Sequence, residues 1–126
     1  GQPGEDVGGT ITFYCQDRPF SEDNLRLANL VQVEIVQAFR GLGYPMHDRG
    51  IVDDLSLATP NEPGTHLILL GPKTERIVRP SLVPGVLSET VFLTHPEEAR
   101  LIRDVAVQER LAIAYADAID AFFAGP

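Results

Sequence analysis

Apolar residues recur along the chain with two different spacings, which predict alternating strands and helices. A run of β-branched and aromatic residues predicts a strand over residues 10–15. Residues 21–40 carry Ala28, Val31, Ile35 and Ala38 three and four positions apart, which is typical of a helix with one buried face. Short apolar runs predict strands over residues 65–70 and 86–92, and capped amphipathic segments predict helices over 96–103 and 107–123.

The predicted order is strand, helix, two strands and two helices, with a long connection over residues 44–63. Fully apolar strands beside amphipathic helices indicate an α/β fold with a small, mostly parallel sheet flanked by helices. We expect residues 1–126 to form a single domain. Because a sheet commonly has about four to six strands, we expect these strands to be part of a larger sheet.

One carboxylate interrupts the last predicted strand. Glu89 stands within the apolar run of residues 83–93, and a buried, unpaired carboxylate is costly. One possibility is an ion pair with Arg49, Arg76 or Arg79. The other is a general acid/base, which the position favours, because sites in open α/β sheets lie at the carboxyl ends of strands.

Composition and charge narrow the possible partners. The chain is 44% hydrophobic and 22% charged, as expected for a globular protein. Its net charge of −8 argues against nucleic acid and against an anionic membrane surface, because neither is attracted by an acidic protein. The apolar runs are too short to cross a bilayer, and no targeting signal is recognisable at the N-terminus.

The remaining candidate side chains form no recognisable catalytic motif. Cys15 is the single cysteine, so it forms no internal disulfide, and we expect a small buried side chain rather than a reactive thiol. The spacing of His47, His66 and His95 fits no compact metal motif, so no metal ligand is assigned. Arg49 is either part of a turn or a contact for a substrate carboxylate.

The last third of the chain resembles zinc-dependent N-acetylmuramoyl-L-alanine amidases of the amidase-3 type. The similarity lies in a proline, an apolar run, a glutamate, a phenylalanine three residues later, an acidic helix start and a glutamine in the terminal helix. These are Pro84, Glu89, Phe92, Glu97, Glu98 and Gln108. Upstream, residues 9–14 resemble the strand that follows the family's second zinc histidine, and Arg49-Gly50 resembles an Arg-Gly step in the family's next loop.

The resemblance implies an activity and a role for Glu89. Enzymes of this family cleave the amide between N-acetylmuramic acid and L-alanine in peptidoglycan, outside the cytoplasm, with a zinc ion and a proton-transferring glutamate at the position of Glu89. The family's zinc ligands, two histidines and a glutamate, have no counterpart here. The resemblance therefore gives no ligand role to His47, His66 or His95.

The leading hypothesis is the C-terminal half of an amidase catalytic domain, inactive alone and completed by a missing N-terminal half. The alternative is a non-catalytic cell-wall-binding or interaction module that reuses the half-fold. Two departures from the family pattern are Val91, where the family usually has glycine, and a longer segment over residues 71–83.

Overall fold

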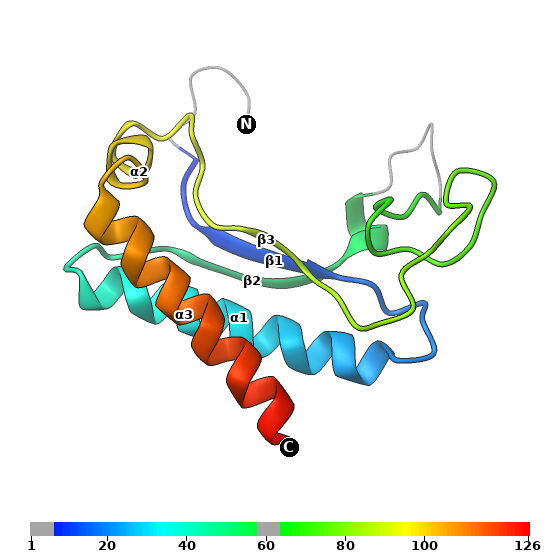
Figure 1. Ribbon diagram of the computed structural model, residues 1–126. Coiled ribbons are helices and arrows are strands. Elements are labelled where there is room, and N and C mark those ends of the chain that lie inside the picture. Colours follow the sequence, from blue (N-terminus) through cyan, green and yellow to red (C-terminus); the bar gives the residue numbers. More distant parts are fainter. Residues whose placement is uncertain (1–6, 58–63) are drawn as a thin grey trace.

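The computed structural model describes residues 7–57 and 64–126, which fold around a three-stranded sheet (Figure 1). β1 (Thr10–Tyr14) lies between β2 (Asp48–Asp53) and β3 (Leu87–Glu89). β1 pairs with β2 in parallel and with β3 in antiparallel orientation. The predicted α/β class is confirmed, whereas the mostly parallel sheet is corrected to a mixed one. A parallel pair needs a crossover, usually a helix, and residues 64–86 return to β1 without one.

Two long helices cover one face of this sheet. α1 (Ser21–Gly41) and α3 (Val105–Ala124) lie on the same side, and the short α2 (Pro96–Leu101) precedes α3 (Figure 1). Ile35 and Phe39 of α1 are fully buried against Leu111 and Ala114 of α3, so the main core lies between these helices. In the part of the chain that the structure describes, no helix has the length and apolar character needed to span a membrane.

The residues at the N-caps of α1 and α2 are not of the types most common at this position. α1 begins at Ser21, and its cap residue, Phe20, makes no side-chain hydrogen bond. The N-cap of α2 is His95, and His95 Nδ1 accepts a hydrogen bond from the backbone N–H of Glu98. Imidazole therefore takes the place that a hydroxyl occupies in the common cap.

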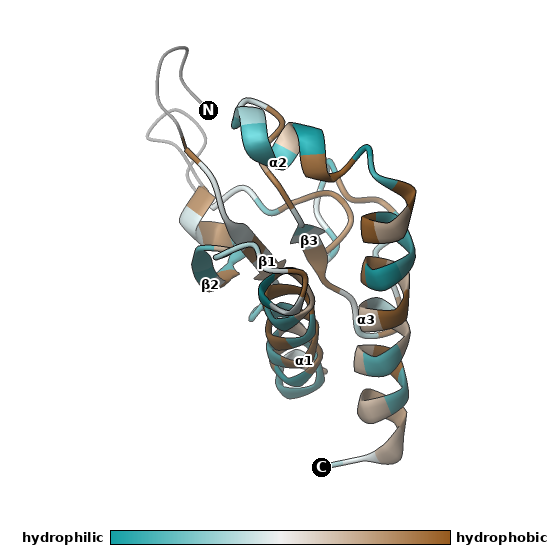
Figure 2. Ribbon diagram, turned by 90° about the vertical axis from the view of Figure 1, so that its left-hand side faces the viewer, coloured by the Kyte–Doolittle hydropathy of each residue, from teal (hydrophilic) through white to brown (hydrophobic). Residues whose placement is uncertain are grey.

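The two faces of β1 have different surroundings. Thr12 points toward α1, where its Oγ1 donates to Gln32 Oε1 at 2.9 Å, and Gln32 Nε2 donates to the carbonyl of Thr10 at 2.8 Å. Because successive side chains of a strand alternate, Phe13 and Cys15 point to the other face, where they pack in a small apolar cluster with Leu70. In Figure 2, α1 and α3 lie side by side and both carry apolar and polar residues, and the apolar residues of the two helices pack in one core cluster.

The predicted connection over residues 44–63 contains regular structure. It includes β2 and a 3-10 helix, η1 (Asp54–Leu57), while residues 58–63 lie outside the described residues. The apolar signal of β2 is weak, since its first two residues, Asp48 and Arg49, are exposed. The strand is held by its parallel pairing with β1 rather than by local sequence preference.

The predicted strand over residues 65–70 is wrong. Leu70 N and Gly71 N both donate to the carbonyl of Leu67, at 3.0 Å and 2.9 Å, which closes a turn. Ile68 and Leu69 are 60% and 71% exposed. The run is therefore apolar on both sides but is not buried on both sides. The apolar pattern alone does not distinguish such a turn from a buried strand.

Candidate functional site

β3 places Glu89 beside the first residues of β1. In the antiparallel register Glu89 lies opposite Ile11, and Ser88 lies opposite Thr12. Tyr115 Oη of α3 donates to Ser88 Oγ at 2.8 Å, so Ser88 faces the helices. Since neighbouring side chains of a strand point to opposite faces, Glu89 points to the face that the two long helices leave uncovered.

The Glu89 carboxylate is exposed and has no partner among residues 7–57 and 64–126. It makes no side-chain hydrogen bond there, and none of Arg49, Arg76 and Arg79 forms an ion pair with it. The Glu89 side chain is not enclosed in an apolar strand, because the regular strand is short and Glu89 is its last residue. The carboxylate is therefore open to a ligand that approaches this face.

Arg49, the predicted substrate contact, lies in the wall of an open pocket of about 500 Å³. Its Nη1 donates to the carbonyl of Gly8 at 3.4 Å, and its guanidinium lies 5.3 Å from the centre of the Phe92 ring. His47 and His95 line the same pocket, although they are far apart in the sequence. The structure thus gathers a fixed positive charge and two imidazoles beside the start of β1.

Glu98 is buried next to this pocket, and its carboxylate accepts several hydrogen bonds. Its carboxylate accepts from Gly9 N and Phe92 N, each at 2.8 Å, and from Tyr44 Oη at 3.3 Å. A side chain at Gly8 would meet Glu98 Oε1 at 2.4 Å, so the backbone closes around the carboxylate. Burial, and after it the negative charge of Glu98, raises the pKa of Tyr44 to about 12.

A second cluster of polar side chains lies where β1 and β2 end. Cys15 Sγ is 3.4 Å from His66 Nδ1, and Asp54 Oδ1 is 2.9 Å from the same nitrogen. Cys15 and Asp54 are completely buried. Within the described residues, these three form the group whose ligand atoms lie close enough together to hold a metal ion.

The predicted burial of Cys15 is confirmed. Burial raises the pKa of the Cys15 thiol to about 12, against the smaller lowering effect of the backbone N–H of Asp17. A buried thiol in its neutral form is a poor nucleophile, since the thiolate is the reactive species. The raised pKa therefore argues against Cys15 as a nucleophile.

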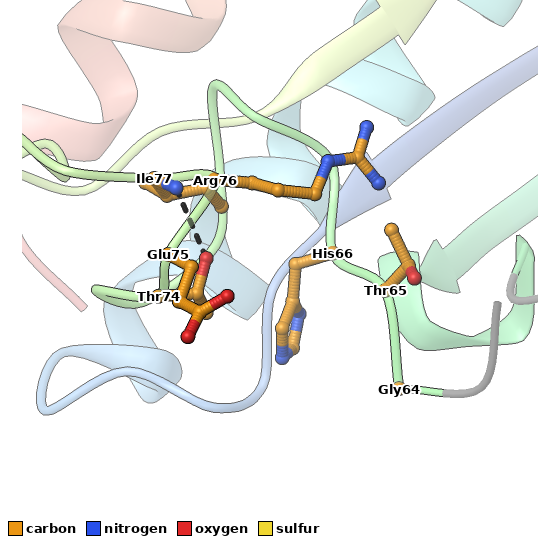
Figure 3. A pocket seen from close by; sticks show the side chains of 7 residues that line it. All are labelled: Gly64, Thr65, His66, Thr74, Glu75, Arg76 and Ile77. Atoms are coloured by element: carbon orange, nitrogen blue, oxygen red, sulfur yellow. Dashed lines mark hydrogen bonds between the residues drawn. The ribbon is translucent and has the colours of Figure 1, made fainter.

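His66 connects the cluster to a pocket of about 300 Å³. Figure 3 shows His66 and Thr65 on one side of this pocket, and Thr74, Glu75 and Arg76 on the segment across from them. Sequence analysis missed the cluster because Cys15 and His66 are 51 residues apart and His66 was expected within a strand. A signal did exist, since Cys15 and Asp54 each follow a β-strand, but β2 was not recognised.

The chain matches one family of enzymes over nearly its whole length. A family profile described as N-acetylmuramoyl-L-alanine amidase matches residues 1–121. Among curated proteins, N-acetylmuramoyl-L-alanine amidase AmiA of Escherichia coli (strain K12) is 38% identical over 47 residues, which are 37% of this chain and 16% of that protein.

Solved amidase structures share the fold. The N-acetylmuramoyl-L-alanine amidase from Clostridium difficile 630 has a TM-score of 0.69 and 23% identity, covering 99% of this chain and 53% of that one. The catalytic domain of CwlV from Bacillus (Paenibacillus) polymyxa var. colistinus has a TM-score of 0.61 and 23% identity, covering 95% and 51%. The chain thus spans about half the length of these solved structures, and less of the curated relative.

Proposed function

The chain belongs to the N-acetylmuramoyl-L-alanine amidase family, and on this premise we propose that it is part of a peptidoglycan hydrolase in which Glu89 transfers protons. The proposed reaction is hydrolysis of the amide between N-acetylmuramic acid and L-alanine, outside the cytoplasm where peptidoglycan lies. Because the chain spans about half of the solved amidase structures, we also propose that the remainder of the catalytic domain comes from residues outside these 126.

The observation that carries the proposal is the exposed carboxylate of Glu89 next to the start of β1, which has no partner among the described residues. Glu89 pairs with Ile11, so it lies beside the segment of residues 7–9 that leads into β1. The resemblance puts the family's second zinc histidine in the segment before this strand. A proton-transferring group at Glu89 would therefore lie close to the side chains of the segment that precedes β1.

The chemistry asked of Glu89 is proton transfer in both directions. As a carboxylate it accepts a proton from the attacking water, whose oxygen bonds to the amide carbon. As the C–N bond breaks, the same carboxyl group donates the proton to the nitrogen of L-alanine. Such general acid–base catalysis typically contributes about 100-fold to 10,000-fold to the rate.

The described residues near Glu89 do not form a zinc site. His47 and His95 line the neighbouring pocket with Arg49, but they belong to no group of three ligands in the part of the chain that the structure describes. The family's zinc would polarise the amide carbonyl and lower the pKa of its bound water. We propose that its ligands lie outside these 126 residues.

Arg49 is the proposed contact for a carboxylate of the peptide. Its guanidinium is exposed and packs against Phe92, which limits its orientations and leaves its outer edge accessible. A planar guanidinium suits a carboxylate because it donates two parallel hydrogen bonds. The stem peptide of peptidoglycan presents carboxylates, so this contact fits the proposed substrate.

The surface features also favour a larger domain. Ile68, Leu69, Leu82 and Val83 are 60%, 71%, 88% and 64% exposed, in the segment that leads into β3. β2 and β3 are both edge strands of the sheet. Exposed apolar residues and open sheet edges are typical of surfaces that another part of a protein covers.

The test combines the chain with the complementary half of the domain and measures release of stem peptide from muramyl-peptide. Glu89→Gln should lower kcat by about 100-fold to 10,000-fold. Glu109→Gln, at an exposed position of α3, is the matched control and should retain full turnover.

Unchanged turnover of Glu89→Gln would refute the role of Glu89. If the combined wild-type halves bind peptidoglycan without cleaving it, the alternative of a non-catalytic cell-wall-binding module replaces the enzyme proposal.

A further inference from the structure

We infer that Cys15, Asp54 and His66 form a binding site for a divalent metal ion of the zinc class, separate from the site at Glu89. Glu89 lies opposite Ile11 of β1, and Cys15 is four residues further along the chain than Ile11. At 3.3 Å per residue this is a separation of about 13 Å. None of these three residues takes part in the amidase reaction proposed at Glu89.

The sheet itself brings two of the three ligands together. Tyr14 and Asp53 are paired in the parallel register of β1 and β2, so the next residues, Cys15 and Asp54, leave the sheet side by side. The carboxyl ends of adjacent parallel strands are the usual place for a ligand site in α/β proteins. His66 joins them from the loop that folds back over this edge (Figure 1).

The distances suit a small tetrahedral ion. Zinc bonds of about 2.0–2.3 Å to nitrogen, oxygen and sulfur place neighbouring ligand atoms roughly 3.3–3.8 Å apart. Cys15 Sγ and His66 Nδ1 are 3.4 Å apart, within this range. Asp54 Oδ1 and His66 Nδ1 are 2.9 Å apart, so they need to separate by about 0.5 Å to admit the ion.

The surroundings orient two of the three ligands, His66 and Asp54, as metal sites require. His66 Nε2 lies 3.5 Å from Asp17 Oδ2, so the ring nitrogen that does not face the cluster has a carboxylate partner. Asp54 Oδ2 accepts a hydrogen bond from Leu67 N at 2.9 Å, which leaves Oδ1 directed at the cluster. Metal-binding histidines commonly have such a carboxylate behind them, and metal-binding carboxylates are likewise held by hydrogen bonds.

The donor set identifies the class of metal. One sulfur, one imidazole nitrogen and one carboxylate oxygen suit Zn²⁺ better than Mg²⁺ or Ca²⁺, which take oxygen ligands. A thiolate and a carboxylate also balance the two positive charges of the ion. Three protein ligands leave the fourth position of a tetrahedral zinc for water or a small ligand.

A metal-free arrangement of the same side chains provides the competing explanation. His66 Nδ1 would then be hydrogen-bonded to Asp54 Oδ1, Nε2 would lie 3.5 Å from Asp17 Oδ2, and Cys15 would remain a neutral thiol. The two arrangements differ in one observable feature, since a metal–thiolate bond exists in the first alone.

Titration of the metal-free 126-residue chain with Co²⁺, a spectroscopic substitute for zinc, tests the inference. One equivalent of Co²⁺ should produce the near-ultraviolet charge-transfer absorption of a cobalt–thiolate bond, and Zn²⁺ should displace it. Cys15 is the single cysteine, so this absorption in the wild type already identifies the ligand. The readout therefore does not depend on whether a variant folds.

Substitutions then test how Asp17 and His66 contribute to metal binding. Asp17→Asn removes the partner of His66 Nε2 and should weaken zinc affinity by about 10-fold to 100-fold, and His66→Gln should weaken it further. His47→Gln alters an exposed histidine outside the cluster and should keep wild-type affinity. Absence of Co²⁺ binding, or binding without the thiolate absorption, would overturn the inference in favour of the metal-free ion pair.

Discussion

Two glutamates of one short stretch, Glu89 at the end of β3 and Glu98 in α2, have opposite surroundings. The Glu98 carboxylate is almost completely buried and accepts hydrogen bonds from two backbone N–H groups and one phenol. The Glu89 carboxylate is exposed and has no partner among the described residues. One side chain therefore stabilises the fold, while the other remains available for chemistry.

The difference shows that local sequence does not determine the burial of a carboxylate. The neighbours of Glu89 are more apolar than those of Glu98, yet Glu98 is the buried residue. Glu98 is buried because residues distant from it, Gly9 and Tyr44, bring donors to it. A buried charge is tolerated where enough hydrogen-bond donors surround it.

The largest expected effect on stability belongs to Glu98. Glu98→Gln leaves one oxygen to serve both Gly9 N and Phe92 N, and its amide N–H group faces one of these donors. An unsatisfied buried donor and the loss of charged hydrogen bonds should lower the free energy of unfolding by about 2–4 kcal/mol. Urea unfolding followed by circular dichroism measures the change.

Glu97→Gln provides the control in the same helix. Glu97 lies in the first turn of α2 with its side chain 56% exposed, and exposed substitutions usually change stability by less than about 0.5 kcal/mol. Equal stability of the Glu97 and Glu98 variants would show that the buried hydrogen bonds of Glu98 contribute nothing net.

Substitution of Tyr44 should change the free energy of unfolding by less than Glu98→Gln does, and this change should depend on pH. Its pKa rises from 10.0 to about 12 in the folded state, so folding favours the neutral phenol. The resulting stabilisation is complete below pH 10 and is lost as the pH rises toward 12. Tyr44→Phe should cost about 0.5–1 kcal/mol near neutral pH, because one long hydrogen bond to Glu98 is removed.

The stabilities of the wild type and Tyr44→Phe should therefore be compared as the pH is raised. The wild type should lose its advantage over the variant between pH 10 and pH 12. Cys15 also has a raised pKa, but it is present in both proteins and its contribution cancels in the difference. A constant difference across this range would contradict the assigned role of Tyr44.

Sequence patterns predicted the helices and the central strand because these elements have local signals. α1 and α3 carry apolar residues at helical spacing, and β1 is rich in β-branched and aromatic residues. β2 begins with exposed polar residues and is held by pairing with a distant strand, so local pattern missed it. The Cys15, Asp54 and His66 cluster depends on that pairing and was missed for the same reason.

The substitution Glu89→Gln should change the free energy of unfolding least. It is also the most direct test of the difference between Glu89 and Glu98. An exposed carboxylate without partners should be replaceable by the neutral amide with a change below about 0.5 kcal/mol in the free energy of unfolding. The substitution also removes one negative charge from a chain with a net charge of −8, which slightly relieves repulsion. Urea unfolding under the conditions used for Glu98→Gln measures it. A loss comparable with that of Glu98→Gln would show that Glu89 has a structural partner. Unchanged stability together with the loss of turnover proposed above would assign Glu89 to catalysis, because a purely structural residue cannot lower the rate without weakening the fold.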